Sequence, residues 1–227
     1  MASNRFTILL LSAWCAAVSP CQTNNTDGIY FRQKVGFSLL YDDIRKCPCL
    51  VWWDIRKQDL IGISRIPSSY FSDDYTLPAP RAKSKWFTRS GYQRGHLCPA
   101  ADRKRNAQLM KATFIMSNMA PMTPFLNTKP WKHSEELSRQ HCVRCGRTQV
   151  VAGCLWSTPV NYSSKVNVIS VPDTLFRCMM CPCDSSHNVF WLFPQSATLE
   201  DEKRYRVSKR RFLSSMKFYF LKYIAPF

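Results

Sequence analysis

The sequence predicts a single α+β domain over residues 28–227. Segments rich in β-branched and aromatic residues outnumber helical patterns, which argues against a doubly wound parallel sheet. No internal repeat, low-complexity segment or linker divides this region. A hydrophobic content of 45% and a charged content of 21% are typical of globular proteins.

Strands are expected where these β-favouring residues cluster between turn residues. The first two are 37–41 and 50–53, and a strand end is expected at 91–96. The stretch 64–90 contains prolines and has no clear period, so it is expected to be a loop. Later strands are expected at 112–117, 149–156, 166–171 and 189–193.

Two helices are expected among these strands. A short one covers 106–112, and a clearer one follows Pro130, because proline suits the first turn of a helix. Trp131, Glu135 and Arg139 then recur every four residues. Residues with this spacing share one stripe of a helix, so these three side chains should lie on one face.

The first 21 residues predict a signal peptide and export. Arg5 precedes an apolar stretch of thirteen residues, 6–18, which suits a signal peptide and is short for a membrane span. The protein would then be periplasmic, extracellular or lipid-anchored through Cys21. The alternative is an intracellular protein with reduced cysteines. No other apolar run is long enough to cross a membrane.

The charge balance is strongly basic. There are 32 Lys+Arg against 15 Asp+Glu, a net charge of +17, which attracts polyanions such as nucleic acid. A basic protein lying on an anionic membrane is the alternative. From Arg81 to Lys111 there are nine basic residues and one acid, Asp102, so the local balance is 9 − 1 = +8. This density favours a substrate that carries phosphate.

Eleven cysteines are many for this length, and ten remain if Cys15 leaves with the signal peptide. In an oxidising compartment an even set indicates disulfides, whose pairing the sequence does not give. Zinc is the competing interpretation, through Cys142-x-x-Cys145 and Cys178-x-x-Cys181-Pro-Cys183 with His141 and His187 nearby. The two pairs are 32 residues apart, against roughly 15–20 in compact zinc modules. Structural zinc is therefore not expected.

The candidate functional residues occupy two stretches, 91–102 and 117–135. They supply an arginine, a histidine, two asparagines and a glutamate, followed one helical turn later by a second arginine: Arg94, His96, Asn118, Asn127, Glu135 and Arg139. A histidine can take a proton, an amide oxygen can hold a hard cation, and arginines can grip phosphate. These are the parts of a metal-assisted phosphodiesterase.

This ordered set closely resembles the DNA/RNA non-specific endonuclease family, which includes secreted bacterial nucleases and mitochondrial endonuclease G. The resemblance covers roughly residues 28–224 and is strongest from 91 to 139. It implies a central antiparallel sheet flanked by helices, with a ββα-metal active-site motif. The implied activity is Mg²⁺-dependent endonucleolytic hydrolysis of DNA and RNA, without sugar or sequence preference, to 5′-phosphate products.

The resemblance also implies the catalytic roles. His96 would be the general base on water, since a neutral imidazole accepts a proton at physiological pH. Arg94 and Arg139 would bind phosphate, and Asn118 would support the histidine and the substrate geometry. For Arg139 the competing interpretation is a surface pair with Glu135, four residues earlier on the helix.

Asn127 is the implied direct Mg²⁺ ligand, with Glu135 and Gln93 acting through metal-bound water. Mg²⁺ retains several waters, so one protein ligand can suffice when other groups orient those waters. Mn²⁺ is the alternative cation. The competing interpretation of Asn127 is a helix cap.

Two residues depart from the family pattern, Gln93 for an aspartate and Met122 for a glutamine. Gln93 removes a negative charge and should weaken Mg²⁺ binding, whereas Met122 should change only packing. The alternative function is therefore a catalytically weakened nuclease-fold protein that binds nucleic acid. A third class, an interaction protein stapled by zinc or disulfides, does not explain the ordered set.

The expected partners are the backbones of DNA and RNA, because contacts to phosphate carry no sequence information. The sequence leaves a homodimer open.

Overall fold

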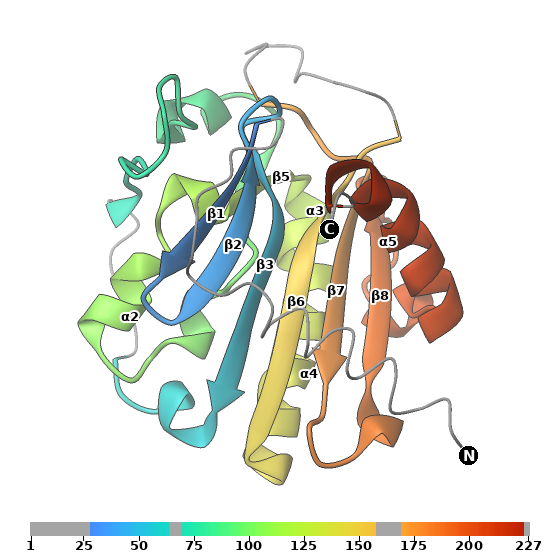
Figure 1. Cartoon of the computed structure of the whole chain (residues 1–227). Coiled ribbons are helices and arrows are strands. Elements are labelled where there is room, and N and C mark those ends of the chain that lie inside the picture. The colour runs from blue at the N-terminus through green and yellow to red at the C-terminus, as the bar shows by residue number, and fades with distance from the viewer. Residues whose placement is uncertain (1–27, 64–69, 158–168, 225–227) are drawn as a thin grey trace.

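A central six-stranded antiparallel sheet organises the computed structural model of the protein, which describes residues 28–63, 70–157 and 169–224 (Figure 1). Its strand order is β1-β2-β3-β6-β7-β8. The strands are β1 (Ile29–Lys34), β2 (Phe37–Asp42), β3 (Cys47–Arg56), β6 (Arg147–Leu155), β7 (Thr174–Met180) and β8 (Val189–Pro194). A separate pair, β4 (Gln93–His96) with β5 (Met119–Met122), is also antiparallel.

Helices cover both faces of the sheet. They are α2 (Ala107–Ala112), α3 (Pro124–Thr128), α4 (Pro130–Cys145) and α5 (Lys209–Ile224), with short 3-10 turns η1 (Lys57–Leu60), η3 (Ser84–Phe87), η4 (Ala100–Asp102), η5 (Met116–Asn118), η6 (Ser185–His187) and η7 (Glu202–Tyr205). Trp131 of α4 packs on Phe193, while Phe212 of α5 packs on Phe176 and Phe190. Phe193 lies on the opposite face of β8 from Phe190, because side chains alternate along a strand. The sheet therefore lies between α4 and α5.

This architecture confirms the predicted α+β class with an antiparallel sheet flanked by helices. The strands expected at 37–41, 50–53, 91–96, 149–156 and 189–193 fall on β2, β3, β4, β6 and β8, and both expected helices are present. The expected strand 166–171 lies partly outside the described residues, and the part described, 169–171, is not in a named strand. The expected signal peptide also lies outside them. No helix in the described ranges combines the length and apolar character needed to span a membrane.

The expected strand 112–117 is wrong. Instead, α2 ends at Ala112, the chain turns, and η5 leads into β5. The hydroxyl of Thr113 donates to the carbonyl of Met110 at 2.7 Å, and the side chain of Asn118 donates to the carbonyl of Thr113 at 2.8 Å. These side chains bind local backbone groups that a strand would present to a neighbour, which is why the apolar run there does not form a strand.

Helix α4 has the boundaries that its sequence indicates. Pro130 occupies the first turn, and Gly146 ends the helix with a φ of 85°, a conformation that favours glycine. Trp131 is fully buried, and its indole nitrogen donates to the carbonyl of His96 at 3.2 Å. The stripe formed by Trp131, Glu135 and Arg139 therefore faces β4 and the core rather than solvent.

The β4–β5 pair requires a glycine at its centre. Gly95 lies opposite Ala120. A Cβ at Gly95 would come within 2.3 Å of the Met122 sulfur, a distance at which the methionine would have to move. Met122 is fully buried there. Met122 therefore contributes to packing, as the sequence predicted for this departure from the family pattern.

A buried carboxylate, Asp74, ties the segment before η3 to the rest of the fold. It accepts hydrogen bonds from Lys34 Nζ at 2.8 Å, from Ser117 Oγ at 2.6 Å and from Thr76 Oγ1 at 2.6 Å. Burial by itself raises the pKa of Asp74, but these three donors hold the pKa below its usual value. Asp74 thereby connects β1 with the turn that contains Asn118.

Replacing this carboxylate should destabilise the protein. We expect Asp74→Asn to lower the free energy of unfolding by about 2–4 kcal/mol at pH 7, because the change leaves a largely buried Lys34 without its counter-charge. The depressed pKa means that the stabilisation is present above the unfolded-state pKa of about 3.9 and is lost as the pH falls through the lower folded-state value. Urea unfolding at several pH values measures both the loss of stability at pH 7 and its dependence on pH.

The less buried neighbour supplies the control, Asp73→Asn, which should change stability little. The interpretation is wrong if Asp74→Asn unfolds at the same urea concentration as the parent at pH 7. It is also wrong if the difference in unfolding free energy between Asp74→Asn and the parent stays constant down to strongly acidic pH.

Candidate active site

A pocket of about 420 Å³ opens between β4, η4, α3 and α4. It collects four residues that the sequence predicted for catalysis or metal binding, His96, Asn127, Glu135 and Arg139. The other lining residues are Pro99, Ala100, Ala101, Thr128 and Lys132. The pocket therefore joins the two stretches of sequence that carry the candidate residues.

His96 ends β4, and its ring packs against two aromatic rings. The ring centroids lie 5.0 Å from Phe114 and 5.8 Å from Phe71. Burial lowers the pKa of His96 from 6.5 to about 4, because the charged imidazolium is poorly solvated there. Its Nε2 atom is buried and has no hydrogen-bond partner among the described residues. His96 is thus neutral at physiological pH and able to accept a proton.

Asn118 lies beneath this histidine and is fully buried. Its Oδ1 atom accepts from the backbone N–H of Cys98 at 3.0 Å, and its Nδ2 donates to the carbonyl of Cys98 at 2.9 Å. The backbone N–H of Leu97 donates to the carbonyl of Asn118. Asn118 consequently fixes the chain directly after His96 and does not line the pocket, which makes it a positioning residue.

Asn127 and Gln93 form a direct pair. Asn127 Nδ2 donates to Gln93 Oε1 at 2.7 Å, so the Asn127 Oδ1 atom is left to serve as an oxygen donor. The helix-cap interpretation of Asn127 is wrong, because Asn127 lies inside α3 and Lys129 is the residue that caps α4. Gln93 therefore keeps the acceptor that an aspartate would supply here, but not its charge.

Gln195, just after β8, holds the start of α3 in place. Its Oε1 accepts from the backbone N–H of Thr123 at 3.0 Å, and its Nε2 donates to the carbonyl of Pro121 at 2.6 Å. The hydroxyl of Thr123 donates to the carbonyl of Gln195. These bonds fix the helix that carries Asn127 against the end of the large sheet.

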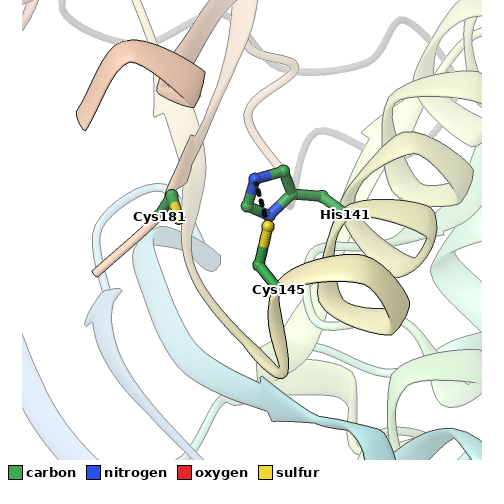
Figure 2. Close-up of side chains that lie close together, drawn as sticks. All are labelled: His141, Cys145 and Cys181. Atoms are coloured by element: carbon green, nitrogen blue, oxygen red, sulfur yellow. Dashed lines mark hydrogen bonds between the residues drawn. The ribbon is translucent and has the colours of Figure 1, made fainter. Parts of the chain in front are cut away.

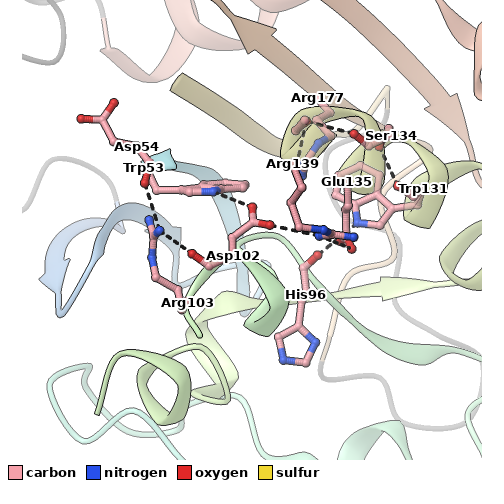
Figure 3. A network of polar contacts seen from close by, with 11 residues as sticks. Trp53, Asp54, His96, Asp102, Arg103, Trp131, Ser134, Glu135, Arg139 and Arg177 are labelled. Atoms are coloured by element: carbon pink, nitrogen blue, oxygen red, sulfur yellow. Dashed lines mark hydrogen bonds and ion pairs between the residues drawn. The ribbon is translucent and has the colours of Figure 1, made fainter. Parts of the chain in front are cut away.

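A charge network lies beneath the pocket (Figure 3). Arg139 Nη1 donates to Asp102 Oδ1 at 3.0 Å and lies 3.9 Å from Glu135 Oε2. Asp102 is fully buried and also accepts from the indole N–H of Trp53 at 3.0 Å. Arg139 is therefore oriented by a buried carboxylate, and its contact with Glu135 is more than a solvent-exposed surface pair.

Arg177, on β7, completes the network from below. It is fully buried, with its guanidinium 5.2 Å from the ring of Trp53 and 5.7 Å from that of Trp131. Burial raises the pKa of Glu135 to about 7, while Arg177 and Arg139 act in the opposite direction. Glu135 therefore exchanges a proton near physiological pH, and a cation in the pocket would favour its ionised form.

Arg94, the other arginine expected to bind phosphate, contacts residues of the segment that precedes β4. Its Nη2 donates to the carbonyl of Ser84 at 2.7 Å, and the guanidinium lies over the rings of Phe71 and Phe87 at 5.3 and 5.7 Å. Arg94 is not among the residues that line the pocket. It connects β4 to η3, next to a basic cleft of about 570 Å³ lined by Ala79, Pro80, Arg81, Lys83, Lys85 and Trp86.

Four residues of the site were not singled out for it from the sequence. They are Asp102, Lys132, Arg177 and Gln195. Asp102 had a usable signal, since it is the one acid among nine basic residues from Arg81 to Lys111. Arg177 lies in an apolar strand, where an arginine needs buried partners, but the sequence does not say which ones.

Comparison with known proteins identifies the family of this chain. The family described as DNA/RNA non-specific endonuclease matches residues 19–215. A nuclease of Nostoc sp. is 32% identical over 148 residues, which cover 64% of this chain and 53% of the relative. The mitochondrial nuclease of Saccharomyces cerevisiae is 31% identical over 133 residues, covering 53% and 40%. Mitochondrial endonuclease G of Bos taurus is 32% identical over 109 residues, covering 48% and 36%.

The chain thus spans about half the length of these relatives or less. Among solved structures, that of an EndoG/EndoGI complex superposes with a TM-score of 0.72 at 20% identity, covering 82% of each chain. At that identity the superposition shows the fold. The family resemblance inferred from the ordered motif is confirmed.

Proposed function

Because the chain belongs to the DNA/RNA non-specific endonuclease family, we propose that it is a Mg²⁺-dependent endonuclease. It would hydrolyse phosphodiester bonds of DNA and RNA without sugar or sequence preference and leave 5′-phosphate products. Mn²⁺ is the alternative cation. The observation that carries the proposal is the single pocket that unites His96, Asn127, Glu135 and Arg139.

The residues present suit a hard divalent cation. The Asn127 amide oxygen is directed by the bond from its own Nδ2 to Gln93, and the Glu135 carboxylate lines the same pocket. Oxygen donors of this kind are those that Mg²⁺ prefers. Asn127 would hold the ion directly, and Glu135 and Gln93 would hold its waters. When bound, Mg²⁺ supplies positive charge that stabilises the phosphorane and the leaving 3′ oxygen.

Side chains of the protein would carry out the remaining steps. Neutral His96 would accept a proton from the attacking water. Arg139, already oriented by Asp102, would direct a planar set of donors at the substrate phosphate. The basic cleft beside η3 would hold the neighbouring phosphates through Lys83 and Lys85. Arg94 would act mainly by anchoring β4 to that cleft.

The alternative is a nuclease-fold protein that binds nucleic acid with weakened catalysis, and Gln93 is the residue that favours it. An aspartate only accepts hydrogen bonds, so it would enforce one orientation of the Asn127 amide. A glutamine both donates and accepts, and it lacks the negative charge. The expected consequence is weaker Mg²⁺ binding rather than loss of the proton acceptor.

A plasmid-nicking assay separates the two functions. Supercoiled DNA and a folded RNA are incubated with the protein in Mg²⁺, with and without excess EDTA. Cleavage of both substrates, abolished by EDTA, with ends that require dephosphorylation before kinase labelling, supports the endonuclease. Retention of DNA on the protein at every Mg²⁺ concentration without cleavage supports the binding protein instead.

Export is our proposal for the compartment. The relatives include mitochondrial and bacterial nucleases, so mitochondrial targeting is the main alternative to export. Mitochondrial targeting segments are amphipathic and arginine-rich. The first 21 residues contain a single arginine, Arg5, and an apolar stretch at 6–18, which suits a signal peptide better.

The N-terminus of the mature protein tests this compartment. Intact-mass measurement of protein expressed in a secreting cell should show that the segment up to about residue 21 has been removed and that the protein is in the medium or periplasm. A chain that keeps Met1 or Ala2 and stays inside the cell would overturn the proposal. A truncated variant in which Met alone replaces residues 1–21 is the matched control, and it should stay inside the cell.

A further inference from the structure

A second group of ligand-type side chains lies away from the nuclease pocket. His141 and Cys145 come from the last turns of α4, and Cys181 directly follows β7 (Figure 2). Their ligand atoms, one imidazole nitrogen and two thiol sulfurs, all lie within 4.8 Å of one another. None of the three lines the pocket that contains His96.

The fold explains why these side chains meet. His141 and Cys145 are four residues apart, so they share one face of α4. Gly146 then turns the chain into β6, whose residue Gln149 pairs with Met180 at the end of β7. This register brings the start of the β7–β8 turn next to the end of α4. The convergence depends on strand pairing, so the sequence indicates that zinc-type ligands are present but not which of them meet.

The separations suit a metal ion. Cys145 Sγ lies 3.4 Å from His141 Nε2. A tetrahedral zinc ion with Zn–S of about 2.3 Å and Zn–N of about 2.1 Å places two such ligand atoms roughly 3.6 Å apart. Modest side-chain movement would bring Cys181 to the same spacing. Cys145 is exposed, so an ion has a route into the site.

Cys183 is the candidate for a fourth ligand. Its sulfur lies 3.1 Å from that of Cys181, well beyond the roughly 2.0 Å of a disulfide bond. Cys183 is not among the three residues whose ligand atoms lie within 4.8 Å of one another, so its exposed side chain would have to move to join them. Three sulfurs and one nitrogen form the kind of closed set that structural zinc sites use.

The histidine is also oriented as a zinc ligand requires. Its Nδ1 atom lies 3.0 Å from the hydroxyl of Thr148, and both side chains are buried. The Thr148 oxygen can accept a hydrogen bond from the Nδ1–H group, which leaves the Nε2 lone pair directed at the sulfurs. Such a partner on the second ring nitrogen typically accompanies a metal-bound histidine.

We propose that His141, Cys145, Cys181 and Cys183 bind a structural Zn²⁺ ion. The ion joins the end of α4, which carries Glu135 and Arg139 two to three turns earlier, to the β7–β8 turn. It holds the catalytic helix against the sheet and keeps three cysteines out of disulfides.

The Cys-x-x-Cys spacing grouped Cys142 with Cys145, but the structure brings His141 together with Cys145 instead. Cys142 does not face this group, because its sulfur donates to the carbonyl of Ile55 at 3.3 Å. The pair on the helix is His141 with Cys145, not Cys142 with Cys145. His187 is exposed and its Nδ1 lies 3.0 Å from Asp184 Oδ2, so we do not include it among the ligands.

The test measures zinc in the full chain. The protein is purified in a thiol-free reductant, stripped with chelator, given excess zinc sulfate and gel-filtered, and its metal content is determined by mass spectrometry. We expect one zinc per chain and a raised Tm. Cobalt in place of zinc should give the visible absorption of a tetrahedral, thiolate-bound ion.

Variants assign the ion to these residues. His141→Gln and Cys145→Ser should lose the zinc and the cobalt spectrum, and Cys145→His should retain zinc with an altered spectrum, which separates ligand loss from misfolding. Three controls should keep one zinc: Cys142→Ala and His133→Gln on the same helix, and Asn127→Ala in the nuclease pocket. Circular dichroism checks that each variant is folded.

Three results would overturn the proposal. One is parent protein that binds no zinc, and another is Cys145→Ser that retains zinc and the thiolate spectrum. The third is a disulfide involving Cys145, Cys181 or Cys183, mapped by peptide mass spectrometry in the natively isolated protein.

Discussion

His96→Ala is expected to reduce cleavage of plasmid DNA by about 10²–10⁴-fold or more. The change removes the proton acceptor whose lowered pKa keeps it neutral at physiological pH. DNA retention should persist, because the basic cleft beside η3 is untouched. Initial nicking rates and gel retardation, measured on the same preparation, report the two properties separately.

The variants must separate chemistry from packing, since the ring of His96 packs against the rings of Phe71 and Phe114. His96→Gln keeps more of the side-chain volume and should be as inactive as His96→Ala. His133, on α4, forms a hydrogen bond with the carbonyl of Glu200. The control variant His133→Ala should therefore retain full activity. Cleavage by His96→Ala at the rate of the parent would refute the assigned base.

The second large effect concerns the metal. Asn127→Ala should abolish activity or raise the Mg²⁺ concentration for half-maximal activity by more than about 100-fold, because it removes the proposed direct ligand. Glu135→Ala should raise it by roughly 10–100-fold, as expected for a group that orients metal-bound water. In contrast, Gln93→Asp should lower it about tenfold by restoring a carboxylate beside Asn127. Activity is titrated against Mg²⁺ for each variant.

Thr128→Ala is the matched control for this series. Thr128 lines the same pocket on the same short helix, but its hydroxyl donates to the carbonyl of Pro124. Its Mg²⁺ requirement should therefore be close to that of the parent. An unchanged requirement in Gln93→Asp would show that our account of this departure is wrong. An unchanged Mg²⁺ requirement in Asn127→Ala would show that Asn127 is not the direct metal ligand.

The sequence by itself determined most of the local elements and the family. Pro130 and the stripe of Trp131, Glu135 and Arg139 predicted α4, because helix starts and helical faces depend on residues a few positions apart. The ordered set from Arg94 to Arg139 predicted the family for a similar reason. Its residues are close enough along the chain to be recognised as one pattern.

Local pattern failed where side chains bind the backbone. The stretch 112–117 contains a run of apolar residues, Phe114 to Met116, that suits a strand, yet Thr113 and Asn118 form hydrogen bonds with nearby carbonyls and the chain turns. The same kind of contact decided the role of Asn118, which holds the loop at Cys98 instead of facing the pocket. Neither contact has a periodic signature.

Only the tertiary structure decided which charges share the site. Asp102 orients Arg139 from 37 residues away, and Gln195 fixes Thr123 from 72 residues away. Arg177 reaches the network because β7 pairs with β6, which places it between Trp53 and Trp131. The convergence of His141, Cys145 and Cys181 follows from the same register. Sheet pairing is set by burial of whole faces, so no short segment of the sequence contains it.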